Sequence, residues 1–170
     1  MGKGKNLQPL QESEYLALAE FRYQLRRFLR FMEDEVRDVG LNPQQWQLVL
    51  AVKGLPRGQT PTISRLAERM QLNHNSMVEL VDRSEEHGLV RRTRLDSDRR
   101  QVVLSIMPEG EALLRRLGTA SRQELRNVGP VLVESVLKLT RESRSEKEKR
   151  GGPAANKKSE KAGGTRKSGP

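Results

Sequence analysis

Residues 62–107 read TISRLAERMQLNHNSMVELVDRSEEHGLVRRTRLDSDRRQVVLSIM, and this stretch decides the fold. Its first half predicts two short helices, because Thr62 and Asn73 are both favoured N-cap residues and each precedes apolar residues at helical spacing. Only Gln71 and Leu72 separate the two helices. Two short helices joined by so brief a turn are typical of a helix-turn-helix.

The hydrophobic period changes after Gly88, which is expected to end the second helix. Residues 89–95 and 101–106 are short and rich in β-branched and apolar residues, whereas residues 96–100 have the polar composition of a turn. This pattern predicts a β-hairpin with a basic tip. A helix-turn-helix followed by a hairpin is a winged helix.

Helices are predicted on both sides of this unit. Residues 14–39 carry apolar side chains at steps of three and four, and Pro43 opens a second helix. A helix beginning at Pro108 is expected to break at Gly129 and Pro130, and a last helix fades toward Arg150. The predicted fold class is mainly α with a small β-hairpin wing, and the predicted regions are an N-terminal arm (1–13), one folded domain (14–148) and a disordered basic tail (149–170).

The composition favours a polyanionic partner and a shared core. The 170 residues carry a formal net charge of +10, and residues 150–170 contribute about half of it. This tail is predicted to be a nonspecific arm for DNA, RNA or anionic lipid, with a solubilising terminus as the alternative. Hydrophobic residues make up only 34% of the chain, which indicates either unfolded segments or a core shared between subunits.

Several classes of protein are disfavoured by what the sequence lacks. It contains no cysteine, only two histidines, and no paired carboxylates or glycine-rich phosphate loop in a suitable context. We therefore expect no enzyme activity, no cofactor and no metal. No apolar stretch is long enough to span a membrane, so we expect a cytoplasmic protein without a membrane partner.

The run from Thr62 to Leu114 resembles the MarR family of bacterial and archaeal winged-helix transcription regulators. The matching motifs are Leu66-Ala67-Glu68-Arg69, Leu80-Val81-Asp82-Arg83, Glu86-His87-Gly88-Leu89-Val90, Asp98-Arg99-Arg100 and Glu109-Gly110. The resemblance implies a homodimer that binds double-stranded DNA in the nucleoid. It also implies that the N-terminal and C-terminal helices form the subunit interface.

Polar residues at the start of the second short helix are candidates for major-groove contacts, because the N-terminal turn of a recognition helix enters the groove. Asn75 is the leading base reader, since asparagine pairs well with adenine. Capping is the favoured role of Asn73, whereas base contact and an ordinary surface role are equally open for His74, Asn75 and Ser76. Arg83, further along the helix, is able to reach a phosphate. The recognition-helix candidates are Asn73, His74, Asn75, Ser76 and Arg83, and the phosphate-positioning candidates are Thr62, Ser64 and Arg65.

Glu79 is unexpected in a helix that reads DNA, because a carboxylate repels phosphates. It could accept a hydrogen bond only from a base such as cytosine, through its N4 amino group. The favoured interpretation is an ion pair with Arg83, four residues further along the helix.

The predicted hairpin concentrates arginines near its tip. Such side chains can enter a narrow minor groove, and the resemblance implies that Arg99 or Arg100 inserts there while Asp98 orients an arginine. A charged hairpin that only faces solvent is the alternative. The arginines of the hairpin are Arg91, Arg92, Arg94, Arg99 and Arg100. The candidate DNA contacts are Arg94, Asp98, Arg99 and Arg100.

All six aromatic residues lie in the first two predicted helices. The resemblance implies that these aromatic side chains lie either at the dimer interface or in a pocket for a small aromatic ligand. The favoured interpretation is that they form the core of the dimer interface. These candidates are Tyr15, Phe21, Tyr23, Phe28, Phe31 and Trp46.

The sequence therefore predicts a homodimeric, sequence-specific DNA-binding regulator. We expect it to act as a repressor that a small aromatic or anionic effector releases from DNA. The alternative is a nonspecific architectural or RNA-binding protein that acts through the charge of its wing and tail.

Overall fold

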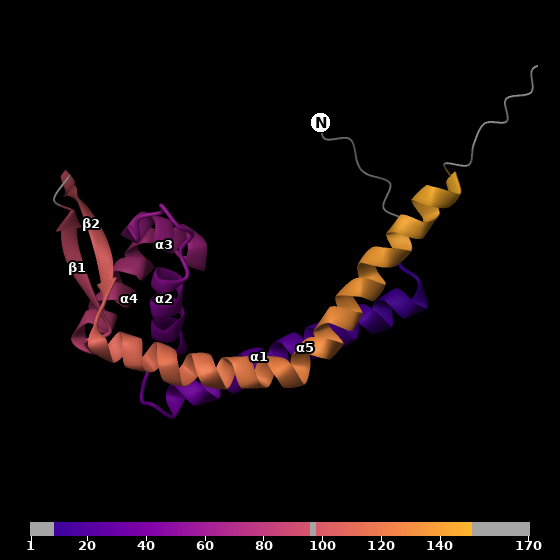
Figure 1. Ribbon diagram of the computed structural model, residues 1–170, viewed down its shortest axis with the longest axis horizontal. Coiled ribbons are helices and arrows are strands. Elements are labelled where there is room, and N and C mark those ends of the chain that lie inside the picture. Colours follow the sequence, from indigo (N-terminus) through magenta and orange to yellow (C-terminus); the bar gives the residue numbers. More distant parts are fainter. Residues whose placement is uncertain (1–8, 96–97, 151–170) are drawn as a thin grey trace, which may run out of the picture.

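The computed structural model describes residues 9–95 and 98–150 (Figure 1). The described helices and strands, in chain order, are α1 (Glu12–Arg37), α2 (Pro43–Lys53), α3 (Ile63–Met70), α4 (His74–Glu86), β1 (Val90–Leu95), β2 (Asp98–Ile106) and α5 (Pro108–Arg150). Most of the predicted N-terminal arm and basic tail, residues 1–8 and 151–170, lies outside the described residues. No helix in the described ranges is long and apolar enough to cross a membrane.

The predicted helix-turn-helix and hairpin are confirmed, and they pack with α2 at one end of the molecule (Figure 1). Met77, Leu80, Val81 and Ser84 form the buried face of α4, as the apolar spacing predicts. They pack in one core with buried residues of α2, α3 and the hairpin, among them Trp46, Leu48, Val49, Leu66 and Leu104. This core leaves the opposite face of α4 exposed.

The second strand of the hairpin is longer than predicted. Its strands pair antiparallel from Val90 opposite Ile106 to Arg94 opposite Val102, and an irregularity follows at Arg94 and Leu95. Strand β2 begins at Asp98, so the predicted turn over residues 96–100 is too long, and Asp98 to Arg100 belong to the strand. Beyond the irregularity, the register holds one further pair, Leu95 opposite Asp98, which can form in the polar tip because ladder hydrogen bonds do not depend on apolar side chains.

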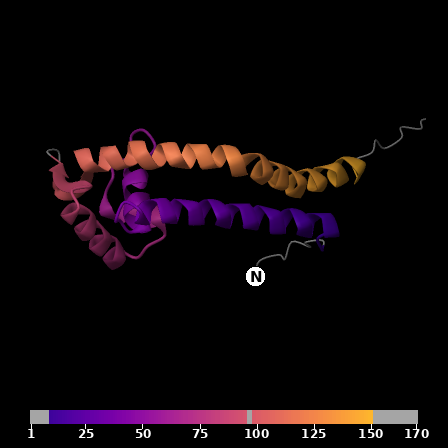
Figure 2. The same ribbon diagram turned by 90° about the horizontal axis from the view of Figure 1, so that it is seen from below.

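The predicted break at Gly129 and Pro130 is wrong, because α5 continues through both residues. Proline interrupts a helix by removing one N–H donor and crowding the preceding turn, and the usual result is a bend. Figure 1 shows α5 changing direction along its length, and Figure 2 shows α5 still lying beside α1. The contact with α1 stabilises helix on both sides of the proline.

The paired helices α1 and α5 bury small and polar side chains between them. Ala17 and Gln24 of α1, and Glu124, Val128 and Ser135 of α5, are all buried. Large apolar side chains of the same two helices are exposed instead, including Leu18 and Leu25 of the predicted apolar stripe. We call these side chains the exposed apolar faces of α1 and α5. They are Tyr15, Leu16, Leu18, Tyr23, Leu25, Leu29, Leu125, Val133, Val136 and Leu137.

Candidate nucleic-acid interface

Helix α4 begins at a side-chain cap. The Asn73 carboxamide oxygen accepts a hydrogen bond of 2.8 Å from the backbone N–H of Ser76. The capping role favoured for Asn73 is therefore present in the structure. The cap fixes the direction in which the first turn of α4 leaves the preceding turn, where Gln71 adopts a left-handed conformation with φ of 55°.

The first turn of α4 presents its polar side chains to solvent. His74 and Asn75 are exposed and Ser76 is half-buried, while Arg83 lies exposed two turns further along the same helix. Because Met77 and its buried neighbours face the core, the exposed residues are available to a ligand that approaches from outside. Four of the five recognition-helix candidates thus lie at least partly free on one helix.

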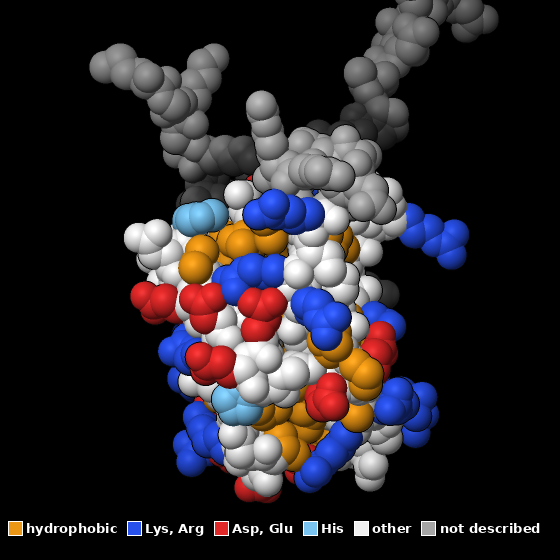
Figure 3. All heavy atoms as spheres, turned by 90° about the vertical axis from the view of Figure 1, so that its left-hand side faces the viewer, with side chains coloured by type: hydrophobic (Ala, Val, Ile, Leu, Met, Phe, Trp, Pro, Cys, Tyr) orange, Lys and Arg blue, Asp and Glu red, His pale blue; other side chains and the backbone are white. Residues whose placement is uncertain are grey.

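The exposed face of α4 becomes acidic after its first turn. Glu79, Asp82 and Glu86 are all exposed. Within the described residues, Glu79 and Arg83 do not form an ion pair, so the prediction that they pair is wrong. Both side chains are long and exposed, and holding them in one geometry costs entropy that a surface pair barely repays. Figure 3 shows acidic and basic side chains intermingled at this end of the molecule.

Arg92 joins the hairpin to α4. Its guanidinium lies 2.7 Å from an Asp82 carboxylate oxygen and also pairs with Glu85, while its backbone N–H donates to Glu85 at 2.6 Å. A further bond of 3.3 Å reaches the carbonyl of Val78. Arg92 is therefore a half-buried link between β1 and α4 and not part of a free basic tip. Strand alternation could have shown this, because Arg92 shares a face with the buried Val90.

The remaining wing residues divide into two groups. Arg91 and Arg94 are exposed on β1. Asp98, Arg99 and Arg100 form the first three residues of β2, where Asp98 pairs with Leu95, so their backbone lies at the tip of the hairpin. The side chains of these three residues lie outside what the structure describes.

The phosphate-positioning candidates lie at the start of α3. The Thr62 hydroxyl oxygen caps this helix by accepting from the backbone N–H of Arg65 at 3.3 Å. The exposed Arg65 side chain donates to the carbonyl of Thr60 at 3.0 Å, which holds the guanidinium near the loop before the helix. Ser64 is exposed. All three candidates are thus brought to one helix terminus.

The six aromatic residues are not gathered into one cluster. Tyr15 and Tyr23 are exposed, Phe21 and Phe31 are half-buried, and Trp46 is only 6% exposed. Phe28 and Trp46 line the same cavity, which has a volume of about 170 Å³ and lies between α1, α2 and α5. Its lining residues are Phe28, Leu29, Met32, Glu33, Val36, Pro43, Trp46, Gln47, Leu50 and Ser121.

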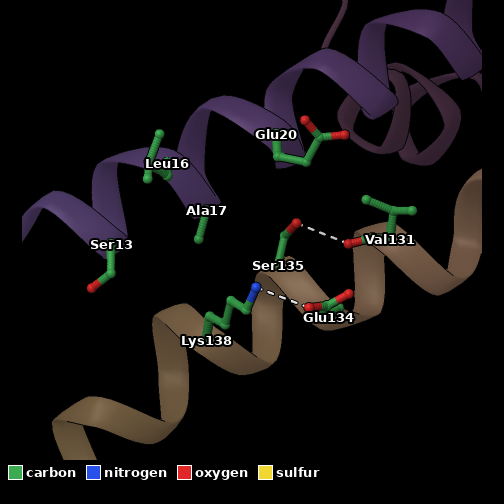
Figure 4. Close-up of a pocket in the computed structure, with 8 residues that line it drawn as sticks. All are labelled: Ser13, Leu16, Ala17, Glu20, Val131, Glu134, Ser135 and Lys138. Atoms are coloured by element: carbon green, nitrogen blue, oxygen red, sulfur yellow. Dashed lines mark hydrogen bonds and ion pairs between the residues drawn. The ribbon is translucent and has the colours of Figure 1, made fainter.

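A second and larger hollow, of about 440 Å³, lies between the first turns of α1 and the far half of α5 (Figure 4). Buried Ala17 and Ser135 line it, and the Ser135 hydroxyl donates to the Val131 carbonyl at 2.8 Å. At its rim, Lys138 donates to Glu134 at 2.8 Å, which lowers the pKa of Glu134 and raises the pKa of Lys138. No local pattern in the sequence indicates this hollow, because its lining comes from residues 13–20 and 131–138, which are far apart in the chain.

Across residues 9–95 and 98–150, no group of three or more acidic or histidine side chains could hold a metal ion. The polar features described above instead lie on α3, α4 and the hairpin. A sequence model of the MarR family matches residues 39–101, which extend from the turn after α1 into β2. Residues 39–101 form a MarR-family winged helix.

One curated relative is similar to part of the chain. The chain is 33% identical over 67 residues to YsmB of Bacillus subtilis (strain 168), described as an uncharacterized HTH-type transcriptional regulator. That alignment covers 39% of this chain and 46% of YsmB, so the chain matches less than half of that relative.

Two solved structures resemble the chain beyond the matched MarR-family segment. One is AbsC, a MarR family transcriptional regulator from Streptomyces coelicolor, with a TM-score of 0.61 and 19% identity over 86% of this chain and 100% of AbsC. The other is Sco3205, a MarR family regulator from the same organism in complex with DNA, with a TM-score of 0.57 and 20% identity over 86% of this chain and 88% of Sco3205. At this identity, the likeness concerns the fold, including the long helices that flank the MarR-family winged helix.

Proposed function

We propose that the protein is a homodimeric regulator of transcription that binds double-stranded DNA at specific sequences. The observation that carries this proposal is the exposed polar first turn of α4, which the Asn73 cap and the buried face of the same helix hold in place. In this arrangement α4 enters the major groove and the tip of the hairpin enters the adjacent minor groove. Residues at the start of α3 position the phosphate backbone without reading sequence.

The exposed apolar faces of α1 and α5 support a dimer. Leu16 is 65% exposed and Val133 is 59% exposed, and such side chains gain free energy when a second surface covers them. A second copy of this chain presents the same faces, which suits a twofold interface. In such a dimer, the two α4 helices bind two DNA half-sites that lie about one helical turn apart.

The cavity beside Trp46 supports an effector site. Apolar and aromatic side chains dominate its lining, and Glu33 is its one charged residue. This lining favours a small aromatic ligand that is neutral or positively charged over an anionic one. Because the cavity lies where α1 and α5 meet α2, an occupant can change the distance between the two α4 helices and so release a repressor from DNA.

Trp46 is the single tryptophan of the chain, so its fluorescence reports directly on that cavity. We expect aromatic compounds that bind to change Trp46 emission and to lower DNA affinity over the same concentration range. Compounds that change emission without any effect on DNA binding would contradict an effector role for this cavity.

The function itself is tested by selecting duplexes from a randomised DNA pool with the full chain. Fluorescence anisotropy then compares the selected duplex with a scrambled duplex of equal length at low and at physiological salt. We expect a preference of about a hundredfold or more that persists at physiological salt. Equal affinity for every duplex, and for RNA, with binding that vanishes as salt rises would instead indicate an architectural protein that acts by charge.

A further inference from the structure

Glu79 occupies the centre of the exposed face of α4. Its neighbour one turn earlier on that face is Asn75, and both side chains are exposed. A four-residue step advances about 6 Å along a helix, which is close to two base-pair steps of 3.4 Å. When α4 lies along the major groove, as proposed above, a duplex that contacts Asn75 through its base edges also meets Glu79.

The other carboxylates of α4 differ from Glu79 in what surrounds them. Arg92 pairs with both Asp82 and Glu85, which offsets part of their charge. Glu86 is exposed at the last residue of the helix, about 10 Å beyond Glu79 along the axis. Among the described residues, no ion pair or side-chain hydrogen bond engages Glu79, so DNA in the groove would enclose an ionised group without a protein partner.

An enclosed carboxylate is costly unless it accepts hydrogen bonds. In the major groove, guanine presents only acceptors, and thymine presents an acceptor and a methyl group. Adenine presents a donor beside the N7 acceptor, which repels a carboxylate. Cytosine presents its N4 amino group as a donor without an adjacent acceptor on the same base. Cytosine is therefore the base that best compensates Glu79.

We infer that Glu79 determines specificity by selecting cytosine, within about two base pairs of the base that Asn75 contacts. This inference rests on the proposed function and names one base of the DNA that α4 reads. Glu79 then disfavours nonspecific DNA, where its charge faces bases or phosphates that cannot compensate it. Asn75 and Glu79 together give α4 an adenine reader and a cytosine reader one helical turn apart.

The test measures base preference rather than affinity alone. The full chain and its Glu79→Gln, Glu79→Ala and Glu86→Gln variants are each used to select duplexes from a randomised pool, and anisotropy then measures each base at each half-site position. For the wild type, we expect replacement of one cytosine to weaken binding about tenfold. Glu79→Ala should lose that discrimination, and Glu79→Gln should shift it toward adenine, with which glutamine forms two hydrogen bonds.

Glu86→Gln is the matched control, because it removes the same charge from the same face two turns away. It should leave the cytosine preference intact. If Glu79→Gln and Glu86→Gln both strengthen binding to every duplex alike and change no base preference, Glu79 acts only by repulsion and the inference is overturned. If the wild type selects a sequence without a Glu79-dependent cytosine, the inference alone fails, whereas a wild type that selects no sequence overturns the proposed function as well.

Discussion

Arg92 holds the wing against α4 through Asp82 and Glu85. Replacing it with alanine leaves two carboxylates close together without their common cation. We expect Arg92→Ala to lower the free energy of unfolding by about 1–2 kcal/mol, because a half-buried charged network is lost. DNA affinity should fall as well, since the hairpin tip is no longer fixed relative to the groove.

Urea denaturation and anisotropy on the selected duplex measure the two effects. Arg91→Ala is the control for stability, because Arg91 is the adjacent exposed arginine and a surface substitution of this kind costs at most about 0.5 kcal/mol. Equal stability of the two variants would show that the Arg92 network contributes nothing measurable.

Glu134 and Lys138 give a prediction about pH. Because the Lys138 ammonium donates to Glu134 and lies beside it, the pKa of the Glu134 carboxyl lies below its ordinary value. The contribution of the pair is complete above the ordinary carboxyl pKa and is lost as pH falls through the lowered pKa. An NMR titration of the full chain should show this lowered pKa, and Lys138→Ala should raise it. A Glu134 midpoint that is the same in both proteins would contradict the contact.

Local sequence rules succeeded for residues whose partners lie within a few positions. The Asn73 and Thr62 caps were predicted because a cap accepts from a backbone N–H two or three residues ahead. The ion pair of Glu79 with Arg83 was wrong, because spacing permits such a contact but does not fix two exposed side chains. The Arg92 network was missed because its partners lie on another element. The DNA contacts of the wing and of α4 stay predictions.

Helix α5 shows where element prediction fails. Gly129 and Pro130 are the two weakest helix formers in succession, and local propensity therefore predicts an interruption. Packing along α1 outweighs that preference, and a bent helix is the result. The other helices and both strands followed from apolar periodicity and caps, although the hairpin tip depends on backbone pairing that side-chain composition does not reveal.

Pro130→Ala should restore the missing N–H donor within α5. We expect the free energy of unfolding to rise by about 1–3 kcal/mol, since proline inside a helix is about 3 kcal/mol less favourable than alanine. The restored hydrogen bond should also straighten α5, which is measured by small-angle X-ray scattering of the full chain.

Gly129→Ala separates propensity from bending. An added Cβ at Gly129 meets open space, so this variant should gain about 0.5–1 kcal/mol without a change in scattering. If Pro130→Ala gives no more stability than Gly129→Ala and leaves the scattering unchanged, Pro130 does not cause the bend.

At the scale of the whole molecule, the exposed apolar faces predict that one charge can prevent dimerisation. Val133→Lys places an ammonium on the exposed apolar face of α5, where its desolvation in the proposed interface is costly. We expect a monomer in sedimentation velocity at micromolar concentration, with DNA affinity reduced because two half-sites are no longer bound together. Val133→Leu keeps the apolar surface and should remain a dimer. A wild-type chain that is monomeric under the same conditions would contradict the proposed assembly.

The exposed apolar faces also make the stability of the fold depend on protein concentration. When the covering surface belongs to a second copy, unfolding releases two chains from one particle, and mass action favours the folded dimer as concentration rises. The melting temperature should therefore increase with total protein concentration. Dilution alone would weaken the fold and DNA binding together, so the number of copies present sets how much regulator is active.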